Sequence, residues 1–92
     1  MDISVRIPTP LRRLTNGQDK VALNSTNIKN MVDDLEKHFP GMEKRLCDDE
    51  GNLRNFVNVY INGEDVRFLN GIDTALKDGD EISLVPAVAG GN

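Results

Sequence analysis

One stretch of this chain, and only one, has the apolar spacing of a long α-helix. The apolar positions, which recur every three or four residues, are Ile28, Met31, Val32, Leu35 and Phe39. Such spacing places these side chains on one face of a helix. Ser25 or Thr26 is expected to cap its start, and Pro40-Gly41 to end it. Because a single helix buries only one stripe, the rest of the core must come from strands.

Five other segments have the alternating apolar and polar pattern of β-strands. The expected strands span residues 2–7, 20–23, 56–61, 64–68 and 81–85. Asn62-Gly63, between the third and the fourth, is a strong signal for a two-residue hairpin turn. The third and fourth strands are therefore expected to pair.

The remaining connections are short. Residues 11–17 are expected to form an irregular connection that closes with the turn residues Thr15-Asn16-Gly17. Met42 and Leu46 indicate a further short helical turn after the main helix. Residues 70–76 are too few for a long helix and predict a turn or two that brings apolar side chains inward.

The order of these elements predicts an α+β domain, in which one main helix crosses one face of a mixed sheet of four to five strands. This is the β-grasp, or ubiquitin-like, arrangement. If the first and last strands lie side by side and parallel, the last strand carries the C-terminal segment off the fold. We therefore expect a β-grasp domain over residues 1–86 and a flexible tail over residues 87–92.

Composition and charge exclude several classes of partner. A formal net charge of −4 argues against binding to nucleic acid. No apolar run is long enough to cross a bilayer, and the N-terminus lacks the features of a signal peptide. We expect a cytoplasmic protein that binds neither nucleic acid nor membrane.

The chain lacks the side-chain groupings that catalysis or metal binding requires. One cysteine, Cys47, and one histidine, His38, make neither a disulfide nor a metal site of useful spacing. Cys47 is expected to be a partly buried structural thiol, and His38 a surface or helix-capping residue. The acidic run at residues 48–50 lacks the interleaved spacing of a calcium loop. We expect no catalytic residue, no metal, no bound cofactor and no enzymatic activity.

The last residues, 86–92, read Pro-Ala-Val-Ala-Gly-Gly-Asn. Gly90 and Gly91 have no Cβ atom, so this segment can lie in a channel too narrow for any side chain. Ala89, just before them, has only a methyl side chain, so the chain leading to the glycines is also narrow. The segment is therefore predicted to insert into another protein, with a glycine carbonyl open to attack.

A partner surface is expected beside this tail. The alternation of the strands turns Phe56, Tyr60 and Val85 outward, where they are predicted to form an apolar patch. The alternative is that the two aromatic residues merely complete a half-buried strand. Arg54 and Arg67 are expected at the rim of the patch, where they add charge pairing or do nothing specific.

Three segments in this order resemble a known family. They are residues 56–68 (FVNVYINGEDVRF), residues 76–81 (LKDGDE) and residues 86–91 (PAVAGG). In this order and spacing they resemble the ubiquitin-like sulfur carriers of the MoaD/ThiS family, and most of all its CysO-type branch. The resemblance covers essentially the whole chain.

The resemblance implies a carrier rather than an enzyme. In such carriers an E1-like enzyme uses ATP to adenylate the last glycine, here Gly91, and sulfur then replaces AMP to give a C-terminal thiocarboxylate. In the CysO-type branch this sulfur passes to a cysteine synthase-like enzyme. In the MoaD and ThiS branches it enters molybdopterin or a thiazole.

Asn92 departs from the family pattern, because it leaves Gly91 without a free carboxylate. Asn92 is either a natural extension, removed by a zinc metallopeptidase of the JAMM type, or a residue foreign to the natural chain; a third reading is that the carrier role has been lost. Two other classes also stay open. They are a covalent modifier that is transferred to lysine, and a ubiquitin-like binding module with an idle tail.

Overall fold

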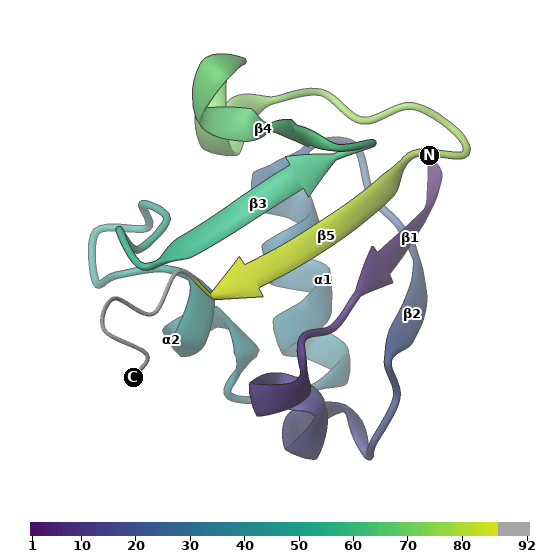
Figure 1. Cartoon of the computed structure of the whole chain (residues 1–92), viewed down its shortest axis with the longest axis vertical. Helices are drawn as coiled ribbons and strands as arrows, with labels where there is room; N and C mark the ends of the chain where they lie inside the picture. The colour runs from purple at the N-terminus through teal and green to yellow at the C-terminus, as the bar shows by residue number, and fades with distance from the viewer. Residues whose placement is uncertain (87–92) are drawn as a thin grey trace.

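The computed structural model describes residues 1–86, which form one five-stranded sheet with the helices on one of its faces (Figure 1). The strands are β1 (Asp2–Arg6), β2 (Lys20–Asn24), β3 (Val57–Ile61), β4 (Glu64–Asp65) and β5 (Glu81–Pro86). Their order in the sheet is β2-β1-β5-β3-β4. β5 is parallel to β1 and antiparallel to β3. The expected β-grasp fold, with its first and last strands side by side, is confirmed.

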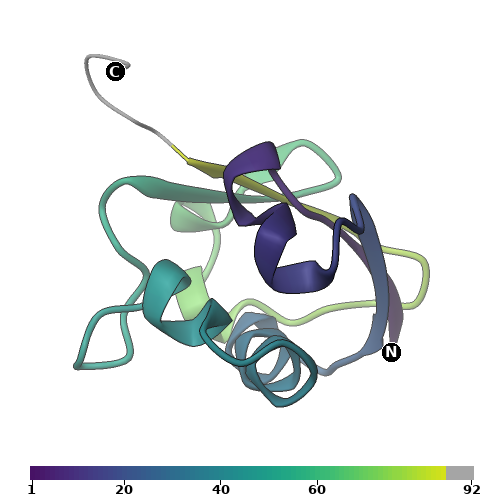
Figure 2. The ribbon, with the colours of Figure 1, turned by 90° about the horizontal axis from the view of Figure 1, so that it is seen from below.

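The main helix, α1 (Ile28–His38), lies under one face of the sheet (Figure 2), and its apolar residues belong to the buried core. Ile28, Met31 and Leu35 have no exposed surface. A second short helix, α2 (Met42–Leu46), follows where a helical turn was expected. Both helices therefore cover the same face, and the other face of the sheet is left open.

The cap of α1 is Asn27, so the expectation of Ser25 or Thr26 was wrong. Asn27 has extended backbone, and its Oδ1 accepts a hydrogen bond from the backbone N–H of Asn30 at 2.7 Å. The Ser25 hydroxyl instead donates to Asp34 at 2.6 Å. All three residue types favour caps, and the hydroxyl of Ser25 is engaged by Asp34 instead.

Residues 9–15 form a 3₁₀ helix, η1 (Thr9–Thr15), where an irregular connection was expected. Pro10 lies in the first turn of η1, where a missing N–H costs nothing and the fixed φ favours a helix. Leu11 and Leu14 pack against the core. The prolines therefore begin a helix as well as ending β1.

The fourth strand is much shorter than the expected residues 64–68. The turn before it is as expected, because Asn62 and Gly63 both have positive φ, at 51° and 90°. β4 ends after Asp65, whose side chain accepts a hydrogen bond from the N–H of Arg67 at 2.8 Å. This bond starts the 3₁₀ helix η2 (Val66–Phe68), and a similar turn, η3 (Gly71–Asp73), comes shortly after it.

Candidate functional site

The end of β5 is the point where the described chain meets the Gly-Gly segment. β5 lies in the middle of the sheet, paired with β1 on one side and β3 on the other. Val85 is opposite Asn58, and Pro86 is opposite Val57. The described chain thus ends on a central strand of the sheet (Figure 1). The predicted tail residues Ala89, Gly90, Gly91 and Asn92 lie outside the described residues.

Two grooves border the end of β5. The first has a volume of about 230 Å³ and lies between η1, α2 and the ends of β3 and β5. Its lining includes Pro10, Leu11, Arg45, Phe56, Val85 and Pro86. The second groove, of about 450 Å³, lies between β1, η1 and β5. Its lining includes Arg6, Pro8, Arg12, Ser83, Val85 and Pro86. Pro8 and Pro10 border both grooves.

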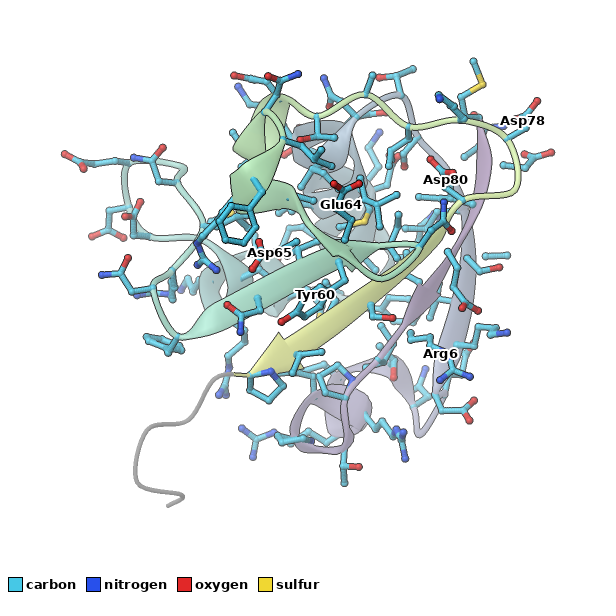
Figure 3. The ribbon with its side chains drawn as sticks, turned by 45° about the horizontal axis from the view of Figure 1, so that its top comes forward. Arg6, Tyr60, Glu64, Asp65, Asp78 and Asp80 are labelled. Carbon is cyan, nitrogen blue, oxygen red and sulfur yellow. The ribbon has the colours of Figure 1, made fainter. Side chains whose placement is uncertain are left out.

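The residues of the predicted apolar patch lie along the open face of β3 and β5. Phe56 and Val85 are 52% and 40% exposed, and both line the first groove. Tyr60 is half-buried and lies further along β3, opposite Ser83, on the open face of the sheet (Figure 3). The structure therefore brings Phe56 and Val85 together at the end of β5, and Tyr60 lies diagonally across the strand pair from Val85 on the same open face. Their role in partner binding stays a prediction.

Arg67 has an internal role that the sequence did not reveal. Its guanidinium donates hydrogen bonds to Asn58 Oδ1 at 2.6 Å and to the backbone carbonyls of Arg54 and Val57 at 2.8 and 2.7 Å. A planar guanidinium can meet three acceptors in this way, whereas an ammonium group is a single point charge. Arg67 therefore joins η2 to the start of β3.

Replacing Arg67 with alanine is expected to lower the free energy of unfolding by roughly 1–2 kcal/mol, because the bonds to the start of β3 are lost. Urea unfolding measures this change. Lys29→Ala, on the exposed face of α1, is the control and should have a much smaller effect. An unchanged unfolding midpoint for Arg67→Ala would show that these bonds do not stabilise the fold and would leave Arg67 free for a partner.

Cys47 is a buried thiol, as expected. Its side chain is part of the core, and only 4% of the residue is exposed. Burial, with the nearby carboxylates of Glu43 and Asp48, raises the pKa of Cys47 from 9.0 to about 11. His38, by contrast, is the exposed last residue of α1. Neither residue has the setting of a nucleophile or a base.

Cys47 is expected to react slowly with iodoacetamide in the folded protein. The reactive species is the thiolate, and a pKa near 11 leaves about a hundredfold less thiolate at neutral pH than a pKa of 9.0 would. The alkylation rate should keep rising with pH above pH 9, and it should reach that of a peptide thiol in denaturant. Native alkylation at pH 7 as fast as that of a peptide thiol would contradict this prediction.

Other positions in the structure were not anticipated. The grooves are lined by Pro8, Pro10 and Leu11 because residues 9–15 are helical. The sequence signal for this helix was Pro10 followed by Leu11 and Leu14. Arg45 reaches the first groove from α2. Phe68 was expected in a strand and is instead 83% exposed on η2.

Residues 1–86 contain neither a cluster of metal-binding side chains nor a membrane-spanning helix. Within that range no group of three or more His, Cys, Asp or Glu side chains could hold a metal ion. No helix in the same range has the length and apolar character needed to cross a membrane.

Comparison with known proteins gives matches over nearly the whole chain. The model of the ThiS family matches residues 5–91. The sulfur carrier protein CysO of Mycobacterium tuberculosis is 45% identical, and the alignment covers 99% of this chain and all of the relative. The small archaeal modifier protein 3 of Haloferax volcanii is 40% identical, over 74% of this chain and 73% of the relative.

The solved structures agree with these sequence matches. A chain in the crystal structure of the Amycolatopsis orientalis BexX/CysO complex superposes with a TM-score of 0.90. It is 42% identical, and the superposition covers 96% of this chain and 98% of that chain. The β-grasp core, the central β5 and the family match that extends through Gly91 all point to one conclusion. The chain belongs to the ThiS family and is a small sulfur carrier of the CysO type rather than an enzyme.

Proposed function

We propose that this carrier bears sulfur as a thiocarboxylate on Gly91, once Asn92 has been removed, and that the sulfur is used to make cysteine. An E1-like enzyme activates Gly91 with ATP, and a cysteine synthase-like enzyme accepts the sulfur. A zinc metallopeptidase of the JAMM type removes Asn92. The carrier itself binds no cofactor, because ATP is consumed in the partner.

The chemistry follows from the weakness of a carboxylate as an electrophile. A carboxylate oxygen of Gly91 attacks the α-phosphorus of ATP, which forms an acyl adenylate and releases pyrophosphate. Hydrosulfide then attacks the acyl carbon, AMP leaves, and the thiocarboxylate remains. The two glycines let the reacting carbonyl enter a narrow channel, because neither has a Cβ atom that would meet its walls.

One observation carries this proposal. The ThiS family match ends at Gly91, so it includes both glycines and leaves Asn92 outside. The full-length similarity to CysO favours cysteine synthesis over molybdopterin or thiazole synthesis as the destination of the sulfur.

The intact mass of the protein purified from its own host tests the proposal. The mass is measured before and after incubation with the host's activating enzyme, ATP and sulfide. We expect loss of Asn92 and replacement of one oxygen by sulfur, located at Gly91 by fragmentation. A chain that keeps Asn92 and all its oxygens, even with the peptidase added, would overturn the proposal.

A second candidate function is covalent modification of proteins. It is favoured by the 40% identity to the small archaeal modifier protein 3. Both functions use the same acyl adenylate, and they differ in whether sulfur or a lysine amine displaces AMP. A ladder of lysine conjugates that disappears without the activating enzyme would support the modifier.

A further inference from the structure

The charges of this acidic protein are unevenly distributed along β5. The protein has 15 acidic and 11 basic residues, yet the charged side chains that line the two grooves at the end of β5 are all arginines: Arg6, Arg12 and Arg45. Among residues 1–86, no Asp or Glu lines either groove. The end of β5 is therefore locally basic.

The opposite end of β5 is acidic. Figure 3 shows Glu64, Asp78 and Asp80 around the start of β5, with Arg6 further towards the other end of the sheet. Asp78 accepts a hydrogen bond from the N–H of Asp2, and Asp80 accepts one from Asn62, so these carboxylates stay at that end. The six residues of β5 separate the two ends by roughly 20 Å, which exceeds the Debye length at physiological ionic strength.

The arginines at the grooves differ in whether their guanidinium groups already have partners within the protein. Arg6 and Glu81 form an exposed ion pair, with 3.7 Å between Nε of Arg6 and Oε2 of Glu81. Within the described part of the chain, the guanidinium of Arg12 donates one hydrogen bond, from Nε–H to the carbonyl of Ile7 at 3.0 Å. Over residues 1–86, neither Arg12 nor Arg45 has a carboxylate within ion-pair distance. These two residues can therefore meet carboxylates of another molecule.

The arrangement fits a protein better than a small anion. Arg45 lines the first groove and Arg12 the second, so the two do not converge on one point. Between them lie apolar side chains shared by the grooves, notably Pro8, Pro10 and Val85. A surface with an apolar centre and charges at its rim is typical of a protein interface.

We propose that Arg12 and Arg45 dock the carrier onto acidic side chains around the mouth of the channel that receives the C-terminal glycines in the activating enzyme. This inference rests on the proposed function, because it assumes that the glycines enter such a channel. The arginines orient the basic end of the carrier towards the mouth and speed the encounter, and the acidic end turns away. The apolar side chains between them then make the short-range contact.

The test measures the association rate of the chain ending at Gly91 with the purified activating enzyme of the same host, over a series of salt concentrations. Arg12→Gln/Arg45→Gln is expected to lower the rate on the order of tenfold at low ionic strength, with a smaller difference at high salt. Arg12→Lys/Arg45→Lys keeps the charge and should stay near the wild-type rate. Lys29→Gln/Lys37→Gln removes two exposed charges from α1 and is the matched control.

Three results would overturn the docking proposal: a wild-type rate for the glutamine pair, an equal loss in the α1 control, or no binding of the wild-type chain. Urea unfolding checks that the glutamine pair is folded. If it is not, the single variants Arg12→Gln and Arg45→Gln replace it, and a wild-type rate for both would overturn the docking proposal. ATP–pyrophosphate exchange is measured in parallel. Salt-dependent binding without exchange would refute the proposed function alone, and normal exchange and association by the glutamine pair would refute the docking proposal alone.

Discussion

The chain that ends at Asn92 is expected to give no detectable ATP–pyrophosphate exchange with the activating enzyme, whereas the chain that ends at Gly91 is expected to be fully active. While Asn92 is attached, the Gly91 carbonyl belongs to an amide, which has no carboxylate oxygen to attack ATP. The effect is therefore all-or-none rather than graded. Exchange of labelled pyrophosphate into ATP measures the adenylation step directly.

Two controls make this comparison decisive. The mass of each chain is measured after the assay, so that trimming during incubation is detected. A chain that ends at Gly91 but carries Gly90→Val tests the narrow channel, and it should lose most of the exchange because a β-branched side chain replaces a hydrogen. Exchange by a chain that still carries Asn92 at the end of the assay would refute the assignment of Gly91 as the reactive residue.

Replacing Ile82 with alanine is expected to lower the free energy of unfolding by about 3–4 kcal/mol, the largest loss of stability among the changes considered. Ile82 has no exposed surface, and it lies on β5, opposite Val5 of β1 and Ile61 of β3. The substitution leaves a cavity between the sheet and the helices. Such a loss is a large share of the 5–15 kcal/mol that typically stabilises a small domain.

Val85→Ala is the matched control for Ile82→Ala, because it removes two methyl groups from the same strand at a position that is 40% exposed. Its effect on the free energy of unfolding, measured in urea, should stay below about 1 kcal/mol. Equal losses for the two variants would contradict the description of β5 as a strand with one buried and one open face. Val85→Ala also slightly enlarges the first groove, so it serves as a test of partner binding in a folded protein.

The elements with strong local signals were predicted well. The apolar spacing of α1 and the Asn62-Gly63 turn lie within a few neighbouring residues, and both are confirmed. The cap of α1, the helical form of η1 and the short β4 were missed. In each case several outcomes were locally possible, and a contact decided among them: Ser25 with Asp34, Leu11 with the core, and Asp65 with the N–H of Arg67.

The candidate site also has one part that could be predicted from the sequence and one part that could not. The Gly-Gly segment and the chemistry it permits are properties of adjacent residues, so they were read directly from the sequence. The interactions of Arg67 were not, because its acceptors are carried by residues 54, 57 and 58, about ten positions earlier in the chain. The sequence pattern around an exposed arginine does not distinguish one that binds a partner from one that binds the backbone of its own chain.

By itself, the sequence determined the main helix, the order of the strands, the fold class and the residue that carries the proposed chemistry. These depend on periodicity, turn residues and the absence of side chains at Gly90 and Gly91. Only the tertiary structure decided what surrounds the end of β5. The grooves there are lined by residues from the start of η1 and from Pro8 before it, by Arg45 of α2, by Phe56 and by residues 84–86. Those segments are distant in sequence, and they meet because β5 pairs with both β1 and β3 in the middle of the sheet.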